Sequence, residues 1–149
     1  MAEENYDNPE TLERWCAQQR VQVANYLRSQ QVKHGRIGEW PAWEIAPHVS
    51  IWAVESLAQP EWIGWWAISG DVPTDYISSA EVGPPQHPRK ALRVIANCWI
   101  QQAEAWQAGR DYEGIRIAGP HSRQEMAPQL ESRARLLLEW VENDSLWPE

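Results

Sequence analysis

The chain is 149 residues long, a length typical of a single domain with one hydrophobic core. With 43% hydrophobic and 23% charged residues, its composition resembles that of globular domains and excludes a disordered or fibrous chain. The formal net charge of −8 opposes attraction to nucleic acid and to anionic lipid, so we expect neither as a partner; it favours basic proteins instead.

The aromatic composition is unusual, with 11 Trp, 4 Tyr and no Phe. Tryptophan is large, and its indole N–H needs an acceptor when it is buried, so a core built from it carries polar contacts at its edges. In one interpretation Trp replaces Phe in the core. In the other, some of the tryptophans form an exposed platform for a ligand or a partner.

A first helix is predicted over residues 9–33. Asp7 or Asn8 can cap it, and Pro9 stands where a first-turn proline is tolerated. Its apolar side chains follow one helical stripe, formed by Leu12, Trp15, Cys16, Val23, Tyr26 and Leu27. The next segment, IGEWPAWEIAP, has prolines at positions 41 and 47 and is predicted to be an ordered loop, since it suits neither a regular helix nor a central strand.

Two strands are predicted next, over residues 49–55 and 62–69, joined by a hairpin-like connector that contains Pro60. Both runs are apolar on both alternating faces, so we expect the sheet to be covered on both faces, or on one face plus a partner. A two-stranded ribbon is marginal in water, and a third short strand over 115–117 would extend it. Residues 70–88 are predicted to be the longest loop.

Two further helices complete the prediction. One starts at Pro88, ends at Gly109 and carries an apolar face of Leu92, Ile95, Cys98, Trp99 and Trp106. The last is indicated by a capping box of Ser122 and Glu125 and by the stripe of Leu130, Ala134, Leu137, Leu138 and Val141, with Pro128 expected to kink it or reset its start. We therefore predict an α+β fold, three main helices packed on a small two- or three-stranded antiparallel sheet, in a single domain of residues 1–149.

The candidate site combines the long loop with the start of the helix at Pro88. Cations in the first turn of a helix are disfavoured by its dipole, so something negative should compensate them. In the structural alternative, Asp71, Asp75 or Glu81 pairs with these cations. In the functional alternative, an anionic ligand binds the helix start with Trp65, Trp66 or Tyr76 as a wall. The basic and polar residues of this helix start are His87, Arg89, Lys90 and Arg93.

Motifs for catalysis and for metals are missing from the sequence. The four histidines are widely scattered, and no His or Cys pair has the spacing of a zinc site, so we expect no metal and no cofactor. Asp71 or Asp75 as general base with His87 as acid would be a catalytic version of the site, but no spacing fixes that geometry, and no residue is assigned as catalytic. Cys16 is interpreted as an inert core thiol. EWPAW at 39 and EWIGW at 61 share Glu-Trp-x-x-Trp, which we treat as coincidence.

The strings IGEWPAWEIAP, VSIWAVES, GWWAISGDVPTDYIS and HPRKALR resemble a family of small acidic bacterial proteins classed as a domain of unknown function. The resemblance runs over roughly residues 10–107, and GWWAISGDVPTDY is its most specific string. It implies a bacterial, intracellular and uncharacterised protein, and it assigns no catalytic residue.

We therefore expect a noncatalytic protein-binding domain of the adaptor or immunity type, located in the cytoplasm. The alternative is a small enzyme or an anionic-metabolite-binding domain that uses residues 70–93. A homo-oligomer whose interface uses the surplus tryptophans is a third hypothesis. Five tryptophans on periodic elements are assigned to the core: Trp15, Trp52, Trp99, Trp106 and Trp140. If the protein has a recognition surface, we expect it around the second group: Trp40, Trp43, Trp62, Trp65 and Trp66.

Overall fold

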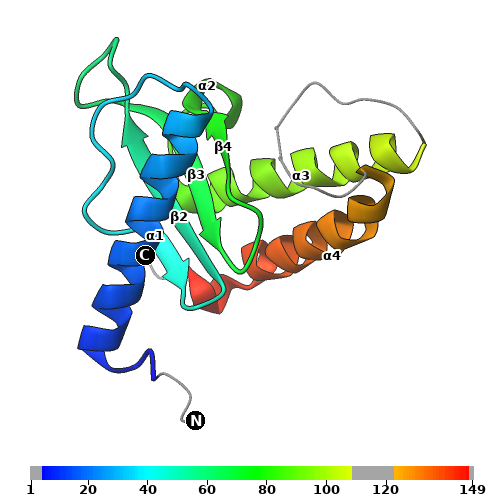
Figure 1. Cartoon of the computed structure of the whole chain (residues 1–149), viewed down its shortest axis with the longest axis horizontal. Helices are drawn as coiled ribbons and strands as arrows, with labels where there is room; N and C mark the ends of the chain where they lie inside the picture. Colours follow the sequence, from blue (N-terminus) through cyan, green and yellow to red (C-terminus); the bar gives the residue numbers. More distant parts are fainter. Residues whose placement is uncertain (1–4, 109–122, 148–149) are drawn as a thin grey trace. The chain divides into compact units, whose positions relative to one another are not determined.

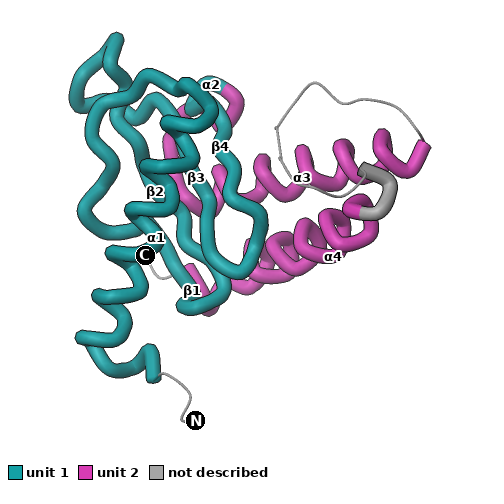
Figure 2. The backbone as a smooth tube through the Cα atoms, in the orientation of Figure 1, with its two compact units in different colours: residues 1–80 teal, residues 81–149 magenta. Residues whose placement is uncertain are grey.

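The computed structural model describes residues 5–108 and 123–147, with the backbone alone for 123–125. The chain divides into two compact units, Met1–Ala80 and Glu81–Glu149, coloured separately in Figure 2. The first unit holds a helix and the whole of the sheet, and the second holds a helical hairpin. The mixed α+β class is thereby confirmed.

Helix α1 spans Pro9–Ser29 and begins as the sequence predicts. The side chain of Asn8 caps it by accepting hydrogen bonds from the backbone N–H groups of Glu10 at 2.9 Å and Thr11 at 3.4 Å. The helix ends four residues before the predicted position 33, because Gln31 takes a left-handed backbone conformation with φ 59°. That turn sends the N–H of Val32 back to the carbonyl of Leu27 and closes the helix end.

The sheet has four antiparallel strands in the order β1-β2-β3-β4. Strands β2, Val49–Glu55, and β3, Ile63–Gly70, are the two predicted from the sequence. Strand β1, Trp43–Ile45, lies in the segment predicted to be a loop, and β4, Asp75–Ser78, lies in the predicted long loop. The expected count of two or three strands was therefore too low. The strand expected over 115–117 lies outside the described residues.

Both missed strands are short and flanked by proline. Because Pro cannot donate to a strand ladder, β1 occupies an end of the sheet, between prolines 41 and 47. Strand β4 follows Pro73 and begins with the polar residue Asp75, so its composition is that of a loop. Gly70 ends β3 with φ +133°, a conformation that L side chains rarely adopt.

Helix α1 crosses one face of the sheet (Figure 1). Val23 and Leu27 of the helix form a buried cluster with sheet residues on this face, Trp52, Val54 and Ala67, and with Ile37. The opposite face is buried as well, through Val49, Ile51, Trp66, Ile68 and Ile77. Both faces of the sheet therefore carry buried side chains.

Trp52, the largest buried side chain of the α1 face, has the polar contact that a buried indole N–H requires. Trp52 donates its indole N–H to Ser50 Oγ at 2.9 Å, and Ser50 Oγ lies 2.8 Å from Ser69 Oγ across the strand pair. These three buried residues satisfy one another without solvent.

Residues 35–38, here called the edge segment, continue the sheet beside the second half of β2. Ile37 forms an isolated antiparallel bridge with Val54. The N–H of Gly38 donates to Ala53 O at 3.1 Å, and the N–H of Glu55 donates to Arg36 O at 2.8 Å. The backbone groups of Ile37 therefore point away from β2.

The second unit is a pair of antiparallel helices, α3, Pro88–Gln107, and α4, Arg123–Glu142, followed by a 3-10 helix η1, Asp144–Leu146. They lie side by side in Figure 1. A one-turn helix α2, Ser79–Val82, crosses the boundary between the units. Helix α3 ends two residues before the predicted Gly109, and Ser122 of the predicted capping box lies outside the described residues.

Pro128 lies inside α4, which runs continuously from Arg123, so it does not reset the start of the helix. Four of the five stripe residues predicted for this helix are buried, whereas Leu138 is half-buried. On α3 the buried residues include Leu92, Ile95, Trp99 and Trp106, with Cys98 half-buried. In the described part of the chain, no helix combines the length and the apolar character needed to cross a membrane.

Candidate functional site

The cations at the start of α3, for which the sequence offered either a loop carboxylate or an anionic ligand as partner, have partners within the helical unit. Arg89 donates from Nε to the carbonyl of Val141 at 2.8 Å and from Nη2 to Asp144 Oδ1 at 2.6 Å. Its guanidinium also lies over the ring of Trp147, 5.8 Å from the centroid. We expected the compensating carboxylate to come from the 70–88 loop. Arg89 is paired instead with Asp144 of η1, because antiparallel packing brings the end of α4 to the start of α3.

The neighbouring basic residues also contact their own unit. Lys90 Nζ donates to the carbonyls of Gly83 at 3.2 Å and Pro84 at 3.1 Å, and Arg93 lies 4.0 Å from Glu142. His87 is the N-cap of α3, and its Nδ1 accepts the N–H of Arg89 at 3.0 Å. This start of α3 is built as a structural cap.

Asp71, Asp75 and Tyr76 lie in the first unit. Asp71 is exposed at the end of β3 and donates its N–H to the carbonyl of His48 at 2.9 Å. Asp75 is fully buried, and its Oδ1 accepts from the N–H of Tyr76 at 2.8 Å and from the hydroxyl of Tyr26 at 3.4 Å. Burial and the charge of Asp75 raise the pKa of Tyr26 far above its usual value.

Tyr76 stands edge-on to Tyr26 and to Trp65, with ring centroids 6.1 and 5.9 Å apart. Tyr76 thus joins the other two rings into one aromatic cluster, and the Tyr26 hydroxyl connects this cluster to the buried carboxylate of Asp75. Asp75 is therefore a structural carboxylate, since a ligand in solvent cannot reach it.

The tryptophans expected to form a recognition surface separate into three groups. Trp66 is only 2% exposed and cannot be the wall of an open site. The reason is the alternation of a strand: Trp65 packs against the buried cluster on the α1 face, and its neighbour Trp66 points to the opposite face. Trp43 and Trp65 are half-buried. Trp40 and Trp62 are 57% and 70% exposed.

The assignment of core tryptophans is largely confirmed. Trp15, Trp52, Trp99 and Trp106 are buried, whereas Trp140 is half-buried. Trp147, in neither of the two groups sorted from the sequence, is also buried and donates its indole N–H to the carbonyl of Trp140 at 2.9 Å.

The exposed tryptophans border two adjoining hollows of the first unit. One, of about 400 Å³, is lined by the edge segment, the end of β2 and the β2–β3 turn, and it includes Trp62. The other, of about 310 Å³, lies between α1 and Trp40. Both are lined by Arg20 and Glu39. We call the two hollows together the Trp40–Trp62 groove.

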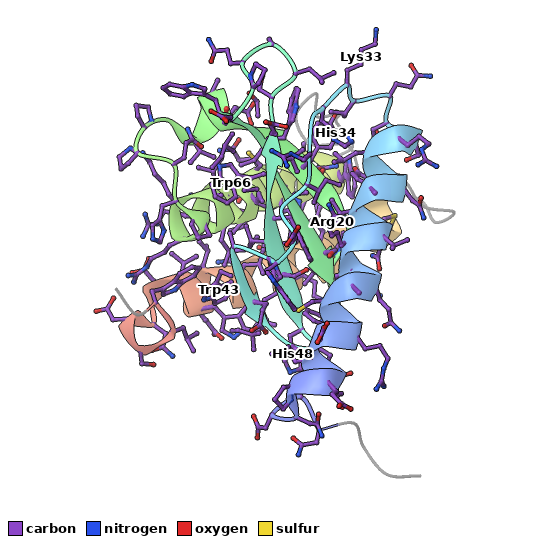
Figure 3. The ribbon with its side chains drawn as sticks, turned by 90° about the vertical axis from the view of Figure 1, so that its left-hand side faces the viewer. Arg20, Lys33, His34, Trp43, His48 and Trp66 are labelled. Atoms are coloured by element: carbon purple, nitrogen blue, oxygen red, sulfur yellow. The ribbon has the colours of Figure 1, made fainter. Side chains whose placement is uncertain are left out.

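Arg20 forms the wall between α1 and the edge segment. It donates from Nε to the carbonyl of Gly38 at 2.9 Å and from Nη2 to the carbonyl of Ile37 at 2.8 Å. Figure 3 shows Arg20 on the side of α1 that faces this edge of the sheet. On the solvent side of α1, Glu13, Ala17 and Val21 continue the groove at spacings of four residues, so they share one helical face.

Glu55 joins the other two sides of the groove. Its Oε1 accepts the backbone N–H of Arg36 at 2.9 Å, and its Oε2 accepts that of Glu61 at 2.8 Å. These two bonds lower the pKa of the Glu55 carboxyl below its usual value. Glu61 has a positive φ of 74°, which is unfavourable for a residue with a side chain. The turn that presents Trp62 is therefore fixed by a specific carboxylate.

The sequence contained one signal of this groove. The Glu-Trp pairs at 39–40 and 61–62, whose similarity we treated as coincidence, both line it. Sequence reasoning missed Arg20 and Val21, because an arginine and a valine on a helix surface are ordinary. It also passed over Glu61. Across the described ranges 5–108 and 123–147, no three His, Cys, Asp or Glu side chains gather closely enough to hold a metal ion.

Comparison with known proteins gives one match. A family model described as Domain of unknown function (DUF4826) matches residues 10–147. No curated protein matches the chain. No solved structure matches it either.

Proposed function

The chain belongs to the DUF4826 family, a domain of unknown function, and we propose from its own surface that it is a noncatalytic protein-binding domain of the adaptor or immunity type. The observation that carries the proposal is the Trp40–Trp62 groove. Four large hydrophobic side chains are exposed in the described residues, Val21, Trp40, Leu57 and Trp62, and all but Leu57 line it. Tryptophan is the residue type most enriched among binding hot spots.

The groove has the properties of a preorganised binding surface. Glu55 holds the turn that carries Trp62, and Arg20 holds the edge segment that leads to Trp40. A side chain already fixed in position loses little conformational entropy when a partner binds. Exposing two indoles on fixed backbone has no structural benefit for an isolated chain, but it favours association.

The same groove favours binding over catalysis. The described residues that line it include four glutamates but no His, Cys, Ser, Thr, Lys or Asp, so it holds no nucleophile paired with a base of the Ser–His or Cys–His kind. The anionic-ligand alternative at residues 70–93 receives no support from the contacts of Arg89 and Lys90, which are directed to their own unit. We also propose a cytoplasmic, bacterial protein, as the free cysteines Cys16 and Cys98 and the family resemblance suggest.

The test compares capture of partners by matched variants. Wild-type protein, Trp40→Ala/Trp62→Ala and Leu57→Ala would each be immobilised and exposed to lysate of the native host, and recovered partners would be measured by calorimetry. Loss of two hot-spot tryptophans should cost at least about 2 kcal/mol, or roughly thirtyfold in Kd. Leu57→Ala removes an equally exposed hydrophobic side chain outside the groove and should bind like wild type.

Recovery of the same partners with equal affinity by all three proteins would contradict the proposal. Light scattering coupled to size-exclusion chromatography tests whether the groove binds a second copy of the chain instead of another protein. A dimer that the Trp40→Ala/Trp62→Ala variant abolishes would show that the groove binds a second copy, which is the homo-oligomer hypothesis.

A further inference from the structure

We propose that the Trp40–Trp62 groove binds a basic segment of a partner protein, with one arginine or lysine side chain of that segment held at each Glu-Trp pair. This inference rests on the proposed binding function and identifies the chemistry of the partner. Its basis is that both pairs, Glu39–Trp40 and Glu61–Trp62, line adjoining hollows.

Each pair combines the two groups that attract an organic cation. An exposed indole attracts a guanidinium or ammonium group to its face, and tryptophan does so best among aromatic residues. The carboxylate next in sequence supplies the opposite charge. Glu39 and Glu61 are both exposed, as are the indoles beside them. A cation at either position can therefore contact a ring and a carboxylate together.

The charges of the groove favour a basic occupant. Its lining contains four carboxylates, of Glu13, Glu39, Glu55 and Glu61, and two guanidiniums, of Arg20 and Arg36. The Arg20 guanidinium is directed to two carbonyls of the edge segment, and Arg36 lies near Glu55, whose pKa it helps to lower. The carboxylates of Glu13, Glu39 and Glu61 therefore make the electrostatic potential of the groove negative, and the net charge of −8 on the whole chain adds to it.

The apolar part of the groove suits the stem of a long basic side chain. Ala17 and Val21 of α1 lie beside Trp40 in the smaller hollow. Lysine and arginine place their methylene groups on such surfaces while the charged head stays in water. The volumes of about 400 and 310 Å³ admit individual side chains of a segment rather than a folded domain.

Arginine should bind better than lysine. Its planar guanidinium stacks on an indole and can donate two parallel hydrogen bonds to a carboxylate, whereas the ammonium of lysine acts as a point charge. The partner surface is therefore expected to present at least two arginines a short distance apart in an extended segment.

The experiment titrates three synthetic peptides into nitrogen-15-labelled full-length protein. The probes are acetyl-(Arg-Gly)₃-amide, its lysine counterpart and its glutamate counterpart, and the signals followed are the indole N–H resonances of Trp40 and Trp62. We expect the arginine peptide to shift both resonances, the lysine peptide to shift them with weaker affinity, and the glutamate peptide to leave them unchanged. High salt should weaken the binding, because exposed charges are screened.

Charge variants then test the carboxylates. Glu39→Gln/Glu61→Gln should raise the Kd of the arginine peptide roughly tenfold, as expected for the loss of two cation-binding carboxylates. The control is Glu10→Gln/Glu104→Gln, which removes the same charge from exposed residues outside the groove and should change Kd less than roughly twofold.

Two results would overturn the inference. The first is an absence of shifts at both indoles with the arginine peptide. The second is equal weakening by the two double variants, which would show that only the overall charge of the protein matters. If captured partners still depend on Trp40 and Trp62 but not on Glu39 and Glu61, the binding function stands and the basic partner is wrong.

Discussion

Replacing Arg89 by alanine should destabilise the helical unit strongly, because three contacts of one side chain join the start of α3 to the end of α4. Its hydrogen bond to the carbonyl of Val141 is from a charged donor and is worth about 1.5 to 3 kcal/mol. The ion pair with Asp144 adds about 0.2 to 1 kcal/mol, since the Asp144 side chain is 92% exposed. The contact with Trp147 adds about 0.5 to 1 kcal/mol.

Because contributions that share one side chain do not add fully, we expect a loss of about 2 to 4 kcal/mol in the free energy of unfolding for Arg89→Ala. Asp144→Ala should cost less than about 1 kcal/mol, since it removes only the exposed ion pair. Arg93→Ala is the matched control. The side chain of Arg93 is 46% exposed and 4.0 Å from Glu142, so its loss should stay within about 0.5 kcal/mol.

Urea unfolding followed by far-ultraviolet circular dichroism measures these differences, and a double-mutant cycle of Arg89 and Asp144 isolates the ion pair. The reasoning is refuted if Arg89→Ala costs less than about 0.5 kcal/mol, or if Asp144→Ala costs as much as Arg89→Ala. A thermal shift with phosphate completes the test. Stabilisation of wild type by phosphate that is lost in Arg89→Ala would revive the anionic-ligand alternative.

Two further predictions concern the first unit. Gly70→Ala should destabilise by at least about 2 kcal/mol in urea unfolding, because φ is +133° and a Cβ would lie 2.6 Å from the carbonyl oxygen of His48. The control is Gly83→Ala in the second unit, where the nearest atom to a Cβ would be 3.9 Å away, and it should cost only about 1 kcal/mol. Equal costs at the two positions would contradict the steric argument. Burial, followed by the charge of Asp75, raises the pKa of Tyr26, so the folded state keeps a proton that the unfolded chain releases near pH 10. The contribution of Tyr26 to the free energy of unfolding should therefore be complete below about pH 10 and be lost as the pH rises further. Tyr26→Phe should flatten this loss of stability in alkaline solution. If the dependence of stability on pH is the same in Tyr26→Phe as in wild type, Tyr26 is not the group responsible.

Periodicity in the sequence was sufficient for the long elements. The stripe that contains Val23 and Leu27 predicted α1, and apolar runs predicted β2 and β3, because burial against a neighbouring element enforces those periods. Strand β4 was missed because three tertiary conditions favour it over its loop-like composition. Asp75 is buried with hydrogen-bond donors, Ile77 is buried, and the strand pairs with β3.

The groove was harder to predict than the fold. Trp62 and Trp66 are four residues apart in similar sequence, yet one is exposed and the other buried, because one lies in the turn and the other on a buried face of β3. The sequence was sufficient to predict that the cations in the first turn of α3 need a negatively charged partner. The partner Asp144 lies 55 residues from Arg89, and only tertiary structure joins them.

Arg20 has a consequence for the behaviour of the protein in concentrated solution. An unpaired strand edge offers carbonyl and N–H groups on which another chain can add a strand, which is a common origin of aggregation. The guanidinium of Arg20 already occupies the carbonyls of Ile37 and Gly38 on the edge segment. At these two acceptors an added strand would have to displace the guanidinium, which disfavours intermolecular strand pairing at this segment.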